Sequence, residues 1–358
     1  MSPRDLIMKA DSILQNLLRE NIKNIQAYSS ARDEFTEANS ELVFLDANEN
    51  PFENGVNRYP DPKQLKVKQL LSEIKEVSTK NMLLGNGSDE VLDLIFRAFC
   101  EPNKDNIIIL PPTYGMYKVL ADINAIDVIE VQLTADFQPK TQTILLAANQ
   151  QSKLLCLCSP NNPTGNSFSR VQVEKLVRQF KGIVVLDEAY IDFSEEESWL
   201  NRLEEFPNLI ITQTMSKAYG MAGIRLGVCY ASKEIISVLN SIKPPYNVNA
   251  LTQQKAIDRL TAKENIQNEI QRIKTQKEGL MVALREIDFI ERIVPSDANF
   301  LLIKVDNATK RYQQLIKTGI VVRNRSNQSL CENCLRISVG TEMENEKLIE
   351  SFQSISKS

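Results

Sequence analysis

A strand pattern is followed directly by a group of polar side chains in the stretch Gly182-Ile183-Val184-Val185-Leu186-Asp187-Glu188-Ala189-Tyr190. Its first part is an unbroken apolar run, which is typical of a strand buried on both faces of a parallel sheet. Comparable runs cover residues 106–110, 153–158 and 208–212. Because helical patterns separate these runs, the sequence predicts an α/β fold built from βαβ units.

The helical patterns between the strands each show one apolar face. Gly87-Ser88-Asp89 opens a helix whose apolar residues over 91–98 share a face. Ser169 and Gln172 have the spacing of a capping box at the start of another helix. Helices of this kind would cover both faces of the sheet, so we expect an α/β/α sandwich with a mostly parallel sheet.

The pattern changes at Ile242-Lys243-Pro244-Pro245-Tyr246-Asn247. A long charged helix is expected over residues 251–287, and Thr341-Glu342-Met343-Glu344 is expected to cap the final helix. Short strands are expected over 299–305, 319–322 and 334–339.

These patterns divide the chain into three predicted parts. An N-terminal segment, residues 1–44, would pack on the site and on the small domain. Residues 45–250 would form the large domain, and residues 251–358 a smaller α+β domain.

The overall composition is that of a soluble globular protein, with 42% hydrophobic and 25% charged residues among 358. A net charge of −4 gives no basic field that would attract nucleic acid or an anionic membrane. No apolar run approaches the roughly 20 residues that a membrane span needs, and residues 1–10 lack the pattern of a secretory signal. We expect a cytoplasmic protein whose partners are small molecules.

The chain contains no histidine, which limits its chemistry. Nucleophilic sites that rely on a histidine base and metal sites with histidine ligands are excluded. Proton transfer then falls to lysine, tyrosine, aspartate, glutamate or a cofactor. Cys331 and Cys334 have the spacing of half a zinc site, but the second half is missing, so we expect no metal.

Asn162, Asp187 and Lys217 each follow one of the apolar runs, with separations of 25 and 30 residues that leave room for a strand and a crossover helix. In open α/β sheets, ligands bind at the carboxyl ends of the strands. Each of these residues alone is also common in ordinary loops, but their joint occurrence at strand ends indicates one site.

The chemistry of pyridoxal phosphate uses all three residues. Lys217 would form the covalent bond with the cofactor's aldehyde, and Asp187 would keep the pyridine nitrogen protonated so that the ring can accept electrons. Asn162 and Tyr190 are placed to hydrogen-bond the phenolic oxygen of the ring.

The cofactor's phosphate requires its own group of donors. Gly87-Ser88-Asp89 would offer backbone N–H groups at a helix start, and Ser216 and Arg225 would add a hydroxyl and a positive charge. Tyr114 is the candidate for the aromatic side chain that lies on the cofactor ring.

With these motifs the chain resembles the fold type I pyridoxal-phosphate aminotransferases, and within them the histidinol-phosphate aminotransferase subfamily. The resemblance covers nearly the whole chain. Two runs are fairly specific to the subfamily: Asn57-Arg58-Tyr59-Pro60 and Pro111-Pro112-Thr113-Tyr114-Gly115-Met116-Tyr117.

The resemblance implies further roles. Tyr59 looks like the tyrosine that reaches the cofactor phosphate of the neighbouring subunit, which implies an obligate homodimer with shared active sites. Arg336 looks like the arginine that pairs with the α-carboxylate of the amino donor, and Arg323 like the one that meets the substrate phosphate. Tyr28 and Asn162 would contact the substrate as well.

Arg325 departs from the family pattern, because it adds a second positive charge beside Arg323. It could assist phosphate binding or face solvent, and solvent is the expectation.

The reaction implied by the resemblance is transamination between glutamate and imidazole-acetol phosphate, which yields 2-oxoglutarate and histidinol phosphate in histidine synthesis. Lys217 would act as the general base. Phosphothreonine decarboxylation and amino transfer with aromatic or varied amino acids are the alternatives within the family. A transcription regulator with an aminotransferase-like domain is disfavoured, because residues 1–44 are too short and not basic enough for a DNA-binding domain.

Overall fold

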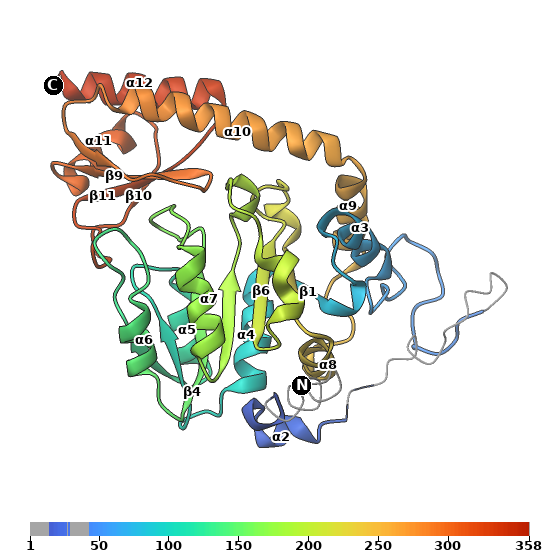
Figure 1. Ribbon diagram of the computed structural model, residues 1–358. Helices are drawn as coiled ribbons and strands as arrows, with labels where there is room; N and C mark the ends of the chain where they lie inside the picture. The colour runs from blue at the N-terminus through green and yellow to red at the C-terminus, as the bar shows by residue number, and fades with distance from the viewer. Residues whose placement is uncertain (1–13, 27, 29–42, 358) are drawn as a thin grey trace. The chain divides into compact units, whose positions relative to one another are not determined.

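The computed structural model describes residues 14–26, 28 and 43–357 (Figure 1). The chain forms two compact units, each made of two segments. Unit 1 consists of Met1–Glu101 and Trp199–Lys263, and unit 2 of Pro102–Ser198 and Glu264–Ser358. The domain bounds expected after residues 44 and 250 stay a prediction. Most of the N-terminal segment, including 29–42, lies outside the described residues.

Unit 1 contains three strands in the order β1 (Met82–Asn86), β7 (Leu226–Tyr230) and β6 (Leu209–Thr214). β7 is antiparallel to both neighbours, and every residue of β6 and β7 is buried. The run 208–212 was therefore correctly predicted as a strand. Neither β7 nor its reversed direction was predicted from the sequence.

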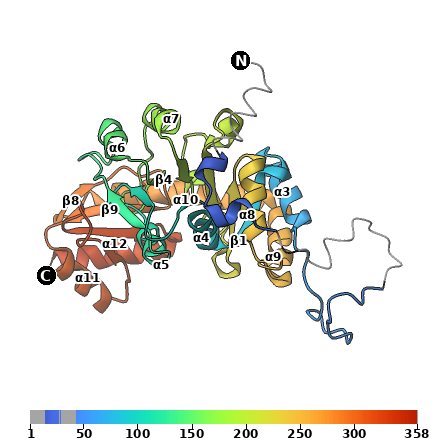
Figure 2. The same cartoon turned by 90° about the horizontal axis from the view of Figure 1, so that it is seen from below.

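Unit 1 also contains the following α-helices among its described residues. They are α2 (Glu20–Lys23), α3 (Leu65–Lys75), α4 (Gly87–Phe99), α8 (Lys233–Ile242) and α9 (Ala250–Thr261). α4 lies against β1 and β7, with α8 beside it (Figure 2). As predicted, the apolar face of α4 is fully buried. Acidic residues in the first turn of α4 interact favourably with the positive end of the helix dipole.

Unit 2 contains a parallel group of strands in the order β5 (Ile183–Asp187), β4 (Ser152–Cys158), β2 (Asn106–Ile109) and β3 (Asp127–Glu130). Three of these strands correspond to predicted runs. The helices between them are α5 (Met116–Ile123), α6 (Thr141–Ala147) and α7 (Arg170–Gln179). Asp187 ends β5 directly beside Cys158, the last residue of β4, so both strands end at one edge.

The start of α7 differs from its prediction. Ser169 is the N-cap residue as expected, but its side chain makes no capping hydrogen bond. The backbone N–H of Ser169 donates to Gln138 Oε1 at 2.9 Å, so the donor that a capping box would offer to Gln172 is already used. The predicted box is therefore wrong.

Unit 2 also contains an antiparallel sheet in the order β10 (Arg323–Asn324), β11 (Cys334–Ser338), β9 (Phe300–Val305) and β8 (Ile290–Ile293). The helices α10 (Lys263–Leu284), α11 (Ala308–Lys317) and α12 (Glu342–Ser356) lie beside this sheet (Figure 1). All three contribute side chains to its core. The capping box of Thr341 and Glu344 is present at the start of α12.

Two predicted elements of the C-terminal half require correction. The helix expected over 251–287 is two helices, α9 and α10, which separate at Ala262. The strand expected over 319–322 is a turn and an extended segment. The N–H groups of Gly319 and Ile320 bond back to Ile316 and Leu315 of α11, so they are not available for a strand ladder.

Within the described ranges, no helix is both long and apolar enough to cross a membrane.

Candidate active site

The predicted site residues belong to both units, and each set has a clear local structure. Unit 1 holds the residues expected at the cofactor phosphate, together with Lys217. Unit 2 holds those expected at the cofactor ring and at the substrate, except Tyr28, which belongs to unit 1.

In unit 1 the start of α4 meets the turn that precedes β7. The N–H of Gly87 donates to the carbonyl oxygen of Arg225 at 2.8 Å. The Arg225 guanidinium donates to Ser216 Oγ and to Asp89 Oδ2, each at 3.4 Å. We call the first turn of α4 with Ser216 and Arg225 the phosphate cradle.

The backbone of the phosphate cradle depends on two glycines. Gly87 has φ +75°, and a Cβ there would lie 2.5 Å from Arg225 Nη2. A Cβ on Gly227 would lie 2.3 Å from Ser88 N and from the carbonyl carbon of Gly87. Gly227 was not among the predicted site residues, although a glycine inside a strand is a known sign of close backbone approach.

The donors of the cradle fit the phosphate of pyridoxal phosphate. Gly87, Ser88 and Asp89 form the first turn of α4, where N–H groups lack helical partners and the dipole favours an anion. A hydroxyl and a guanidinium complete the set, and charge-assisted hydrogen bonds of this kind are the strong ones.

Lys217 lies in the tight turn that follows β6. The N–H of Gly220 donates to the Lys217 carbonyl at 3.0 Å, and the N–H of Met221 donates to the Met215 carbonyl at 2.9 Å. The Lys217 backbone is therefore held by the turn, while the residue as a whole is exposed.

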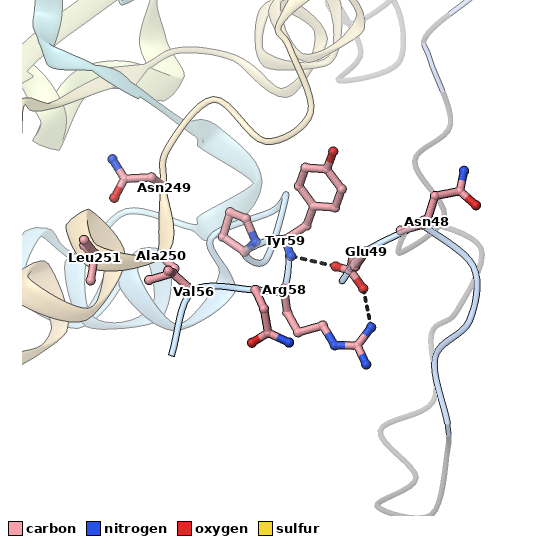
Figure 3. A pocket seen from close by; sticks show the side chains of 11 residues that line it. Asn48, Glu49, Val56, Arg58, Tyr59, Asn249, Ala250 and Leu251 are labelled. Atoms are coloured by element: carbon pink, nitrogen blue, oxygen red, sulfur yellow. Dashed lines mark hydrogen bonds and ion pairs between the residues drawn. The ribbon is translucent and has the colours of Figure 1, made fainter. Parts of the chain in front are cut away.

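Tyr59 lies in a hollow of unit 1 with a volume of about 470 Å³ (Figure 3). Glu49 accepts hydrogen bonds from the Tyr59 N–H at 2.7 Å and from Arg58 Nη1 at 2.8 Å. The Tyr59 ring stacks on Tyr246 with centroids 4.3 Å apart.

Tyr28 and Tyr59 are both exposed, at 75% and 51%. In the described part of unit 1, neither forms a hydrogen bond or a ring contact with the phosphate cradle.

In unit 2, Asp187 is 3% exposed and is held by two donors. The Tyr117 hydroxyl donates to Asp187 Oδ2 at 2.8 Å, and the Ala189 N–H donates to Oδ1 at 3.1 Å. Burial, and then the charge of Asp187, raise the pKa of Tyr117, so this hydroxyl keeps its proton and donates it.

Tyr117 is a residue that the site prediction missed. Its ring meets the edge of Tyr114 at a centroid distance of 5.6 Å, which links the predicted ring-contacting tyrosine to Asp187. The signal was present in the sequence, because Tyr114 and Tyr117 are three residues apart at a helix start.

Asn162 lies in the loop after β4, which is braced from within the unit. Buried Asn161 donates to the Pro112 carbonyl at 2.9 Å and to Thr164 Oγ1 at 2.8 Å. The Asn162 side-chain oxygen accepts a hydrogen bond from Arg336 Nη1. The structure therefore brings together one residue expected at the ring and one expected at a substrate carboxylate.

Tyr190 and Arg336 share a neighbour in Phe300. The Tyr190 ring meets Phe300 edge-on at 5.1 Å, and the Arg336 guanidinium carbon lies 5.2 Å from the Phe300 centroid. Burial raises the pKa of Tyr190 well above its usual value, so the phenol is neutral and can donate a hydrogen bond.

Arg323 and Arg336 face each other across the pairing of β10 with β11. Both line a hollow of about 640 Å³ within unit 2. The expectation that Arg325 faces solvent is wrong for its Nε atom, which is buried and has no hydrogen-bond partner among the described residues.

Within the described ranges, no group of three or more acidic or cysteine side chains could hold a metal ion.

Comparison with known proteins identifies the class. Residues 34–352 match the family model of aminotransferases of class I and II, and the chain belongs to this family.

The most similar relatives found include three histidinol-phosphate aminotransferases. That of Flavobacterium johnsoniae is 61% identical over 95% of this chain and 98% of its own length. The protein of Christiangramia forsetii is 58% identical over 96% of this chain and 99% of its own length. That of Bacteroides thetaiotaomicron is 51% identical over 95% of this chain and 98% of its own length.

Solved structures share the fold. The histidinol-phosphate aminotransferase of Clostridium acetobutylicum has a TM-score of 0.78 at 23% identity, over 84% of this chain and 91% of that one. That of Sinorhizobium meliloti, solved with pyridoxal 5′-phosphate, has a TM-score of 0.76 at 22% identity, over 83% and 84%. The L-threonine-O-3-phosphate decarboxylase of Porphyromonas gingivalis reaches 0.72 at 22% identity, over 85% and 92%.

These comparisons confirm the predicted family, fold class and cofactor. The fold does not separate aminotransferase from decarboxylase, because both kinds of structure match. The roles of the individual site residues stay predictions.

Proposed function

We propose that the chain transfers an amino group between L-histidinol phosphate and 2-oxoglutarate, which gives imidazole-acetol phosphate and L-glutamate, in the biosynthesis of histidine. The observation that carries the proposal is 61% identity, over 95% of the chain, to a histidinol-phosphate aminotransferase. Seven further relatives with the same name are 48–59% identical.

Pyridoxal phosphate, when bound, supplies the aldehyde that takes up the amino group and the ring that accepts electrons from the substrate's Cα. The phosphate cradle would hold its phosphate. Asp187, oriented by Tyr117, would hold the proton on the pyridine nitrogen, and Asn162 and Tyr190 would bond the phenolic oxygen.

Lys217 would anchor the cofactor and then serve as the base that removes the proton from the substrate's Cα. The turn after β6 holds the lysine backbone in place, so only its side chain has to move between the two tasks. The chain contains no histidine that could take over this proton transfer.

Arg336 would bind the α-carboxylate of glutamate. A guanidinium suits this task because it offers two parallel donors to a carboxylate. The hydrogen bond to Asn162 fixes its orientation. Arg323, on the paired strand, would meet the phosphate of histidinol phosphate.

We also propose a homodimer in which Tyr59 reaches the partner's cofactor phosphate. The exposure of Tyr59, and its lack of contact with the cradle of its own unit, support this proposal. Tyr28 is exposed in the same way and is proposed to line the substrate pocket. A cytoplasmic location is supported by the six cysteines, all of which are free thiols in the structure.

The first test is spectroscopic. The cofactor-loaded protein is mixed with histidinol phosphate or with phosphothreonine, without a keto acid. We expect histidinol phosphate to remove the visible absorption of the lysine-bound cofactor, and 2-oxoglutarate to restore it. Release of carbon dioxide from phosphothreonine with the absorption retained would instead establish the decarboxylase.

A variant tests the role of Lys217. Lys217→Ala is expected to bind cofactor and to lose all turnover, because both the anchor and the base are removed. Turnover at the wild-type rate would contradict the assigned mechanism.

A further inference from the structure

Three arginines converge on one face of the paired strands β10 and β11. Arg323 lies directly opposite Arg336 in the antiparallel register. Directly opposed residues project to the same face of a sheet, and so do residues two positions apart on one strand. Arg325 lies two positions after Arg323, and its N–H extends the ladder by donating to the Cys334 carbonyl at 2.8 Å.

The intervening residue confirms the alternation. Asn324 Nδ2 donates to Thr309 Oγ1 of α11 at 3.4 Å, and Asn324 Oδ1 accepts from Ser326. The side chain of Asn324 is therefore engaged with α11, while its two arginine neighbours share the other face.

The three guanidiniums lie close enough to affect one another. Burial lowers the pKa of Arg325, and the charge of Arg323 lowers it further. Burial and then Arg325 lower the pKa of Arg336. Arginines remain charged through shifts of this kind, so the face carries three positive charges.

In the described part of unit 2, none of these three arginines forms an ion pair with an acidic side chain. Among the described residues, Arg336 donates to the neutral amide of Asn162, and the buried Nε of Arg325 has no acceptor there. Like charges gathered without a carboxylate are unfavourable by themselves. An anion with more than one negative charge would neutralise them.

We infer that Arg325 is a second phosphate-binding residue that selects substrates carrying a phosphate monoester. This inference rests on the proposed function. Arg323 and Arg325 together would bind the phosphate, whose charge is close to −2 at neutral pH, while Arg336 remains available for a carboxylate. Histidinol, which lacks the phosphate, leaves two guanidiniums uncompensated and is disfavoured relative to histidinol phosphate.

The test compares Arg325→Gln, Arg325→Lys and the wild type as cofactor-loaded proteins. Single-turnover rates are measured over a concentration series of histidinol phosphate, histidinol and glutamate. We expect Arg325→Gln to lose roughly 10- to 100-fold in kcat/KM for histidinol phosphate, mainly through KM, as is typical for one charge-assisted hydrogen bond. The rate with glutamate should change less than about 3-fold, and Arg325→Lys should recover part of the loss because it restores the charge.

Arg292→Gln is the matched control. Arg292 is exposed on β8, at the opposite edge of the same sheet, and the substitution removes the same charge. If Arg325→Gln lowered the rates with histidinol phosphate, histidinol and glutamate equally, or lowered none of them beyond the control, the selective role would be overturned.

A second measurement separates this inference from the proposed function. Inorganic phosphate is added as a competitor of the glutamate reaction, and its inhibition constant is determined for wild type and for Arg325→Gln. An inhibition constant raised at least 10-fold in the variant supports the phosphate site even if histidinol phosphate proves not to be a substrate. An unchanged constant rejects the site, whatever the substrate is.

Discussion

Lys68 is a buried lysine whose removal should stabilise the protein. It lies on α3 with 8% of its surface exposed, near Lys243, which is 9% exposed. Lys243 Nζ donates to the carbonyls of Pro244 and Pro245 and to Asn247 Oδ1. Burial first, and then the charge of Lys243, lower the pKa of Lys68 to about 8.

The direction of the effect follows from proton linkage. The unfolded chain binds the Lys68 proton with the ordinary pKa of 10.5, and the folded protein binds it less tightly. Folding therefore carries a penalty that is complete below pH 8 and disappears as the pH rises towards 10.5. A difference of about 2.5 pKa units corresponds to roughly 3 kcal/mol.

Lys68→Met removes the charge and keeps a side chain of similar length. The entropy of unfolding is roughly 2.1 cal/mol/K per residue, so for the whole chain 3 kcal/mol corresponds to an increase of about 4 °C in Tm. We expect this increase at pH 7. Above pH 8 the wild type should approach the variant, because the folded protein then releases the Lys68 proton.

The assay is differential scanning calorimetry of the cofactor-loaded proteins at several pH values between 7 and 9.5. Lys66→Met, on the exposed face of the same helix, is the control and should leave Tm nearly unchanged at every pH. The reasoning is refuted if Lys68→Met lowers Tm at pH 7. It is also refuted if the difference from wild type stays constant across this pH range.

Two further substitutions test the site. Gly87→Ala should weaken cofactor binding about 10-fold in a spectroscopic titration, because its methyl group would lie 2.5 Å from the guanidinium of the phosphate cradle. Gly55→Ala is the control, because Gly55 has a similar positive φ but no atom within 4 Å of an added Cβ, and this variant should bind cofactor normally. Tyr117→Phe should cost about 1.5–3 kcal/mol of unfolding free energy in urea, since Asp187 loses a buried donor, and it should lower kcat. Tyr312→Phe removes the hydroxyl of a partly buried tyrosine elsewhere in unit 2, and an equal loss there would show that the contact with Asp187 is not special.

Periodicity predicted the strands well where burial is complete. The runs that became β2, β4, β5 and β6 are mostly apolar, and in the structure nearly every residue of these strands is buried. The direction of a strand does not follow from its own residues, so the antiparallel orientation of β7 was not predictable from the sequence of the strand. Gly319 and Ile320 were misassigned because their N–H groups complete the end of α11, a contact that depends on the preceding helix.

The candidate site was predictable where residue type limits the chemistry. A lysine, an aspartate and an asparagine at successive strand ends have few joint explanations, and the structure places Asp187 at the end of β5 and Lys217 just after β6. Residues whose role depends on a contact with a residue distant in the sequence could not be predicted in this way. Tyr117 acquires its meaning from Asp187, 70 residues later, and Arg325 from its pairing with the strand that contains Arg336.

Backbone packs directly on backbone where β7 passes the start of α4. Position 227 therefore accepts no side chain, and the path of the first helical turn is set by peptide groups alone. Ser88 and Asp89, in the same turn, are partly exposed. Directed evolution could diversify these two positions and retune anion affinity while the N–H donors stay where they are. The positions of the backbone N–H donors would stay the same in such variants, while the polarity of the side chains at positions 88 and 89 would change.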